Sequence, residues 1–300
     1  MANTSQPEKR FKNPRNQDLE RLHFTIGGSD GRPMATDLSY QKNGNAQSLV
    51  IYAHGINGFK DWGGMDLVAE YFAARGAAFL KFNFSHNGTT PSRPLEFFDL
   101  EAYGHDSYLK RQFDLQEIFK HVQRFRADLP FDFDQICLIG HSRGGTDALL
   151  FANQETSLHK LITWSAPSEA TTPWRKWDSD AMKSWAREKV YHLKNGRTGQ
   201  ELPVYYELYE EYRRERNHKL NTEAAARSLT KPWLIAHGEA DESVFIDEAY
   251  RLKQWQPAAE TVVIPKAGHT YGRKHPWESA QLPEETVVLA DRCLDFILEK

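Results

Sequence analysis

Six short apolar segments recur along the chain, and they constrain its fold more than any other feature of the sequence. They are near-continuous apolar runs rather than alternating ones, as expected for strands that are buried on both faces of a sheet. Segments with helical periodicity separate them; between residues 108 and 129, apolar side chains recur at steps of three and four. Strands that alternate with helices predict an α/β fold with a mostly parallel sheet covered on both faces. The six runs span residues 48–55, 77–85, 135–142, 160–168, 233–241 and 261–269.

Three segments lie outside this alternation. Residues 1–20 are polar and predict an N-terminal arm that precedes one domain over residues 21–300. The extended runs 22–28 and 34–41 predict an antiparallel hairpin. Between residues 171 and 230 the connection is too long for an ordinary loop, and 21 of its 60 residues are charged, against 26% of the whole chain. We expect this segment to be a helical cap inserted over the sheet.

The composition argues against several classes of protein. A net charge of −3 over 300 residues offers no electrostatic basis for binding nucleic acid or an anionic membrane surface. No apolar run approaches the roughly 20 residues that span a membrane, and the first residues do not resemble an export signal. Two cysteines cannot form a disulfide framework, and Cys137 lies in an apolar run, so we expect a buried thiol. These features predict a soluble, cytoplasmic protein.

Chemically useful residues follow several of the apolar runs. In parallel sheets the carboxyl ends of the strands meet at one edge, and reactive groups gather there. Ser142 follows one run inside Gly140-His141-Ser142-Arg143-Gly144, a Gly-x-Ser-x-Gly pattern between a strand and a helix. Such a turn exposes the serine hydroxyl above the sheet, and its glycines allow the neighbouring strand and helix to approach. The pattern predicts a nucleophile.

A serine hydroxyl needs a base to act as a nucleophile, and the base needs a carboxylate to fix its tautomer and offset its charge. Asp241 and His269 follow later runs and complete the order serine, acid, histidine. We therefore expect Ser142, Asp241 and His269 to form a catalytic triad. Glu239 and Glu169 remain alternatives for the acid, and His275 is an alternative for the base.

Other residues near the strand ends have less specific interpretations. His54 is expected to bond the backbone, and His86 could either face the pocket or pack in its loop. By residue type, His237, Glu239, Asp241 and His269 could bind a metal ion, but the triad explains them more simply and no metal is expected. The cap is rich in aromatic residues, most of which should hold its helices together. Candidates for substrate binding are Trp174, Trp177, Tyr206 and His86.

Four motifs carry a resemblance to a known superfamily: AHGINGF, GHSRGG, HGEADESV and AGHTYG. In their order and spacing, which span roughly residues 48–300, the chain resembles the α/β-hydrolases. It is most similar to the branch that holds dienelactone hydrolases, cinnamoyl and feruloyl esterases and prolyl-oligopeptidase-type catalytic domains. The resemblance implies that Ser142 is the nucleophile, Asp241 the acid and His269 the base. It also implies an oxyanion hole formed by the backbone N–H groups of Ile56 and Arg143.

These observations predict a serine hydrolase that cleaves a carboxylic ester of a small molecule through an acyl-enzyme intermediate, without a cofactor. A thioesterase, an amidase or peptidase, and a C–C bond hydrolase could use the same triad. A non-catalytic binding protein of the same fold is a further alternative, but binding alone would not require all three groups at the strand ends.

An imidazole base predicts the pH dependence of the reaction. An ordinary histidine gains a proton between about pH 7 and pH 6, and the protonated ring cannot accept the serine proton. We expect kcat/KM for an ester to fall as the pH decreases through this range. A kcat/KM profile that is flat down to about pH 4.5 would show that the base is not a histidine.

Overall fold

The computed structural model describes residues 18–42, 48–129 and 131–299. The N-terminal arm expected over residues 1–20 lies almost entirely outside these ranges, and the first strand, β1, already begins at Leu19. Among the described residues, no helix is long and apolar enough to cross a membrane.

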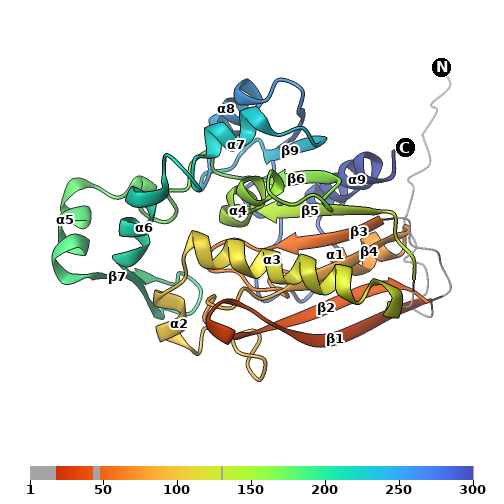
Figure 1. Ribbon diagram of the computed structural model, residues 1–300, viewed down its shortest axis with the longest axis horizontal. Coiled ribbons are helices and arrows are strands. Elements are labelled where there is room, and N and C mark those ends of the chain that lie inside the picture. Colours follow the sequence, from red (N-terminus) through yellow and green to blue (C-terminus); the bar gives the residue numbers. More distant parts are fainter. Residues whose placement is uncertain (1–17, 43–47, 130, 300) are drawn as a thin grey trace, which may run out of the picture.

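An eight-stranded sheet forms the centre of the molecule (Figure 1). Its strand order is β1-β2-β4-β3-β5-β6-β9-β10; β1 and β2 form the expected hairpin, β2 pairs antiparallel with β4, and the other pairs are parallel. All six apolar runs form strands, so the expected α/β architecture is confirmed; β3, β4 and β9 are buried along their whole length, whereas β10 is a partly exposed edge strand. The strands are β1 (Leu19–Gly27), β2 (Pro33–Gln41), β3 (Ser48–Ala53), β4 (Ala77–Phe82), β5 (Gln135–His141), β6 (Lys160–Trp164), β9 (Trp233–Gly238) and β10 (Glu260–Ile264).

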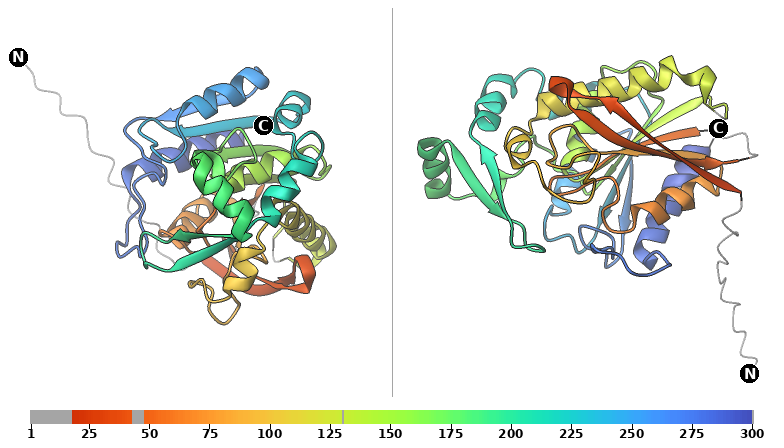
Figure 2. Two further views of the ribbon diagram at one scale, coloured as in Figure 1. Left: turned by 90° about the vertical axis from the view of Figure 1, so that its left-hand side faces the viewer. Right: turned by 90° about the horizontal axis from the view of Figure 1, so that it is seen from below.

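Helices cover both faces of the sheet (Figure 2). On one face, α1 (Met65–Ala73) and α9 (Glu284–Leu298) pack on a core that includes the buried Cys137. The other face is covered by α3 (Tyr108–Arg124), α4 (Arg143–Ala152), α7 (Thr222–Ser228) and α8 (Asp247–Trp255), which share a second core. A short helix, α2 (Leu100–Gly104), precedes α3.

Most of the segment from 171 to 230 lies beyond the carboxyl ends of the parallel strands, at the left of Figure 1, whereas its last helix, α7, packs on the sheet beside α8. It contains α5 (Ser179–Glu188), α6 (Glu207–Glu215) and α7, together with a hairpin of β7 (Val190–Lys194) and β8 (Glu201–Tyr205). The hairpin was not expected in a segment interpreted as helical. It forms because apolar side chains alternate along both strands, so that one face can pack against neighbouring aromatic residues.

The turn between β5 and α4 brings backbone segments into close contact near the strand ends. A Cβ atom on Gly140 would collide with the backbone of Gly144, and a Cβ atom on Gly144 would collide with the carbonyl oxygens of Ala53 and His54. Any side chain at either position would therefore push α4 away from the sheet. The two glycines allow the helix to start directly against β3 and β5.

This close approach predicts a specific sensitivity to a methyl group. We expect Gly144→Ala to lower the free energy of unfolding by about 1–3 kcal/mol, the usual effect of overpacking, and to lower activity by displacing Ser142. Gly196→Ala is a matched control, since its Cβ would meet no atom within 4 Å. Denaturant unfolding and ester hydrolysis measure both effects; equal behaviour of the two variants would contradict this account of the turn.

Candidate active site

Ser142 occupies a strained turn at the carboxyl end of β5. Its backbone has φ 54° and ψ −127°, a conformation that a residue with a side chain rarely adopts. The backbone N–H of Ser142 donates a hydrogen bond to the carbonyl oxygen of Trp164 at 2.8 Å, which ties the turn to β6. Ser142 lines a cavity of about 720 Å³, a size typical of sites for small molecules. The turn thus holds a hydroxyl group at the wall of a binding cavity.

His269 follows β10 and faces a carboxylate. Its Nδ1 lies 2.8 Å from Oδ2 of Asp241, and Oδ1 of Asp241 accepts hydrogen bonds from the backbone N–H groups of Ser243 and Val244, both at 2.9 Å. Burial alone would raise the pKa of Asp241, but the hydrogen bond and charge of His269, with the Val244 N–H and the Ser165 hydroxyl, lower it to about 2. Asp241 is therefore ionised at neutral pH, and it fixes a proton on Nδ1 of His269.

His141 connects the serine turn to the loop of His269. Its Nε2 donates a hydrogen bond to the backbone carbonyl of His269 at 2.9 Å, and the two rings lie 4.9 Å apart. Burial, with the nearby charges of His269 and Arg273, keeps the pKa of His141 well below its ordinary value, so this ring stays neutral. Because Ser142 and His269 line the same cavity, the structure brings the three residues of the expected triad to one edge of the sheet.

Two backbone N–H groups beside Ser142 are available to a ligand. Among the described residues, neither the N–H of Ile56 nor that of Arg143 donates a hydrogen bond. His54 supports this loop: its Nδ1 bonds the carbonyl of Gly55 at 2.8 Å, and its Nε2 accepts from the N–H of Phe84 at 3.3 Å. Burial, followed by the charge of the Arg111 guanidinium, lowers the pKa of His54 to about 3, so it is neutral and serves the backbone, as expected.

The alternative acids and base have other partners. Glu239 is exposed and accepts a hydrogen bond from the N–H of Lys266, while Glu169 lies 3.5 Å from Arg251. His275 lines the cavity but accepts a hydrogen bond from the N–H of Gly63 at 3.2 Å. None of these three side chains has a position equivalent to that of Asp241 or His269.

Of the four candidate substrate-binding residues, the structure places Trp177 at the cavity. Trp174 and Tyr206 do not line the cavity and pack inside the insertion, at ring distances of 5.7 and 5.2 Å from Trp185. His86 is buried away from the cavity, where its Nδ1 bonds the hydroxyl of Ser85 at 2.8 Å. These three residues are therefore not retained as substrate contacts.

Sequence reasoning missed several aromatic residues of the cavity wall. Phe59 and Trp62 follow the Gly55–Ile56 turn, and Phe245 follows Asp241. The signal that could have found them is their closeness in sequence to the strand ends. Together with Trp177 they form an aromatic wall of the cavity that Ser142 also lines.

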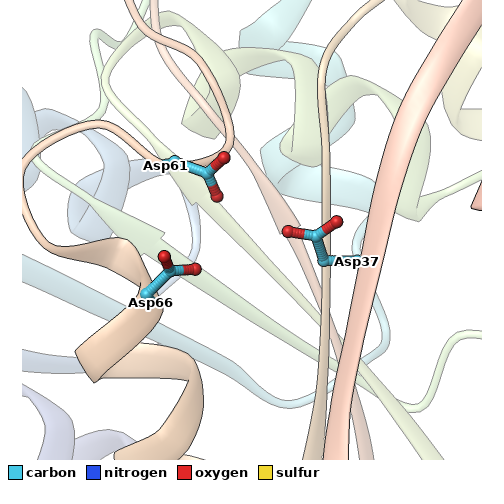
Figure 3. A group of neighbouring side chains, drawn as sticks. All are labelled: Asp37, Asp61 and Asp66. Atoms are coloured by element: carbon cyan, nitrogen blue, oxygen red, sulfur yellow. The ribbon is translucent and has the colours of Figure 1, made fainter. Parts of the chain in front are cut away.

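Among the described residues, three carboxylates converge at one place only, outside the cavity. Figure 3 shows Asp37, Asp61 and Asp66 pointing toward one another. Two lysine ammonium groups form hydrogen bonds with these carboxylates. Nζ of Lys81 donates to Asp37 at 3.0 Å, to Asp66 at 2.6 Å and also to Asp61. Nζ of Lys60 donates to Asp37 and to Asp61, both at 2.6 Å. Burial would raise the pKa of Asp37, but these cations hold it well below its ordinary value. The group is a charge network that links β2, β4 and α1.

Comparison with known proteins identifies the fold and the family. A sequence model of the prolyl oligopeptidase family matches residues 103–295. Est1E from Butyrivibrio proteoclasticus superposes with a TM-score of 0.66 at 19% identity, covering 92% of this chain and 97% of Est1E, and another structure of Est1E contains ferulic acid. A putative dienelactone hydrolase from Klebsiella pneumoniae gives a TM-score of 0.59 at 15% identity, covering 94% of this chain and 99% of that one.

A peptidase shares the same architecture. The acylaminoacyl peptidase of Pyrococcus horikoshii superposes with a TM-score of 0.63 at 14% identity, over 93% of this chain and 41% of the peptidase. At these identities the structures establish the α/β-hydrolase fold. No curated protein matches the chain significantly.

The contacts of Asp241 predict which carboxylate supports the base. Asp241→Asn keeps the shape of the side chain but favours the wrong tautomer of His269, a change that costs about 10⁴ in kcat in a comparable triad. We expect kcat to fall at least about 10²-fold for Asp241→Asn and less than about tenfold for the controls Glu169→Gln and Glu239→Gln. Kinetics with one activated ester on folded proteins measure this, and the reverse ranking would assign the acid to another strand end.

Proposed function

Because the chain belongs to the prolyl oligopeptidase family of serine hydrolases, we propose that it hydrolyses a carboxylic ester of a small or medium-sized molecule. The observation that carries the proposal is the pairing of Asp241 with His269 at the cavity that Ser142 also lines from a positive-φ turn. A hydroxyl, an oriented imidazole and a buried carboxylate at one cavity are the groups that acyl transfer requires.

The reaction begins with proton transfer. Nε2 of His269 removes the proton from Ser142 Oγ as this oxygen attacks the carbonyl carbon of the ester. Asp241 accepts the Nδ1 proton in a hydrogen bond and stabilises the imidazolium that forms. The N–H groups of Ile56 and Arg143, which have no acceptor among the described residues, donate to the developing oxyanion.

Collapse of the tetrahedral intermediate releases the alcohol and leaves an acyl group on Ser142. His269 gives its proton to the leaving oxygen and then takes one from water, which attacks the acyl carbonyl. The second tetrahedral intermediate uses the same two N–H donors. Release of the carboxylic acid restores Ser142, and the cycle needs no group beyond the side chains and backbone already named.

The cavity supports a compact substrate with an apolar part. Its aromatic wall, which includes Phe59, Trp62 and Trp177, can bury an apolar acyl or alcohol group. Est1E, which has a similar fold, binds ferulic acid, an aromatic acid, in a solved structure. Peptide hydrolysis is the second candidate, since the family and the acylaminoacyl peptidase favour it.

Replacing the nucleophile tests the proposal. Ser142→Ala removes one hydroxyl group, so it should remain folded while kcat for 4-nitrophenyl butyrate falls at least about 10⁴-fold, as expected for a triad without its nucleophile. Ser92→Ala, on an exposed loop, is the matched control and should keep full activity. Steady-state kinetics on the purified proteins measure both values.

A substrate series distinguishes the two candidate reactions. The wild-type protein should cleave the butyrate ester with a kcat/KM at least about tenfold above that for N-acylated peptide anilides, including acylalanine 4-nitroanilide. A preference for the anilides would make the protein a peptidase. Unchanged ester hydrolysis by Ser142→Ala would contradict the proposed nucleophile.

A further inference from the structure

The cavity has an unusual charge balance. Among the described residues that line it, five carry a lysine or arginine side chain and one carries a carboxylate, whereas the whole chain has a net charge of −3. A cavity with low-dielectric walls and one sign of charge concentrates ligands of the opposite sign. The five cations are Arg175, Lys176, Arg197, Arg273 and Lys274.

The single carboxylate of the lining is already fully engaged. Glu248 lies on α8, and its two oxygens accept hydrogen bonds from the two terminal nitrogens of Arg175 in a bidentate pair. One of these oxygens also accepts from the N–H of Ser168 at 2.8 Å and from its hydroxyl at 2.5 Å. Arg175 and Glu248 therefore neutralise each other and join the insertion to the domain, and four cations remain.

Arg273 is a buried cation without an acid partner among the described residues. It is 4% exposed, and none of the described ion pairs includes it. Its neighbours are neutral: Nε donates to the carbonyl of Thr270 at 3.2 Å, Nη1 contacts the sulfur of Met65, and Nη2 has no hydrogen-bond partner in the described part of the chain. Burial lowers the pKa of Arg273 below its ordinary value. A buried, uncompensated guanidinium is costly, and an anionic ligand would relieve that cost.

The other three cations stand on two walls of the same cavity. Lys274 follows Arg273 in the loop after β10, five residues beyond His269. Lys176 and Arg197 belong to the insertion; Lys176 lies over the ring of Phe245 at 4.2 Å, and Arg197 lies in the turn between β7 and β8. None of the three has a carboxylate within ion-pair distance among the described residues. Cations thus approach the cavity from both the domain and the insertion.

We propose that the substrate is an ester that carries a second, anionic group, a carboxylate or a phosphate, which Arg273, Lys274 and Arg197 bind. This assignment rests on the proposed ester hydrolysis and specifies its substrate class. The aromatic wall holds the apolar part of the substrate, and the cations hold its charged end. Arginine is suited to this role because its planar group donates two parallel hydrogen bonds to a carboxylate or phosphate.

Matched pairs of esters test the proposal on the acyl side and on the alcohol side. The first pair is 4-nitrophenyl adipate, with a free carboxylate, and 4-nitrophenyl methyl adipate, in which that carboxylate is methylated. The second pair is 4-butyryloxybenzoate and its methyl ester. We expect kcat/KM to be at least about tenfold higher for the anionic member of at least one pair, mainly through a lower KM. Addition of salt to about 0.5 M should reduce this ratio, because it screens the charges.

Variants assign the preference to named cations. Arg197→Gln and Lys274→Gln, both exposed, should each lower kcat/KM for the anionic ester at least about threefold more than kcat/KM for its neutral partner. Arg273→Met should bring the anionic-to-neutral ratio of kcat/KM to about one. The melting temperature of this variant shows whether it is folded. Arg213→Gln is the control: it removes an exposed cation of the insertion that does not line the cavity, and the ratio should not change.

Product-like inhibitors identify the anion. Competitive inhibition of neutral-ester hydrolysis by adipate, and not by inorganic phosphate, assigns a carboxylate; the reverse result assigns a phosphate. Equal kcat/KM within both ester pairs, in a protein whose ester hydrolysis depends on Ser142, overturns the anionic substrate and leaves the esterase proposal intact. Absence of Ser142-dependent hydrolysis of all four esters overturns both.

Discussion

The contact between the start of α4 and the ends of β3 and β5 is the constraint on which the site depends. Gly140 and Gly144 have no space for a Cβ atom, and Ser142 takes a positive φ between them. Arg143 is the first residue of α4, so its N–H has no intrahelical partner, and Ser142 before it lines the cavity. The hydrogen bond from Ser142 N–H to Trp164 fixes the turn on the next strand. A strained turn of this kind persists only where the surrounding structure holds it.

Two neutral histidines hold the loops of the site in place through hydrogen bonds to the backbone. His54 bonds the loop that contains Ile56, and His141 bonds the backbone of His269. Burial keeps the pKa of both below the ordinary range, so neither adds positive charge beside His269. Asp241 behaves in the opposite way, since hydrogen bonds overcome the effect of burial and keep it ionised. The site therefore places one ionised carboxylate against the imidazole of His269, beside histidines that stay neutral.

Much of this arrangement could be predicted from the sequence, because its causes are local. Near-continuous apolar runs identify the strands, and a parallel sheet brings the ends of those strands together, so the order of residues along the chain is enough to group Ser142, Asp241 and His269. No local sequence pattern identifies the side chains that line the cavity. Trp174 and Trp177 are three residues apart and both pack on Trp185, yet of the two only Trp177 lines the cavity, whereas Trp174 also packs against Tyr209 and Tyr212. Tertiary packing likewise determines that Nη2 of Arg273 has no hydrogen-bond partner within the described ranges.

The central claim is that Ser142 is a nucleophile activated by His269. Stoichiometric labelling with a fluorophosphonate, followed by mass spectrometry of the digested protein, tests it directly, since only an activated hydroxyl reacts readily with such a probe. The account predicts one adduct per chain, located on Ser142, with a labelling rate at least about 10²-fold lower in His269→Ala. An unlabelled Ser142 in the folded wild-type protein, or an adduct formed equally fast without His269, would contradict it.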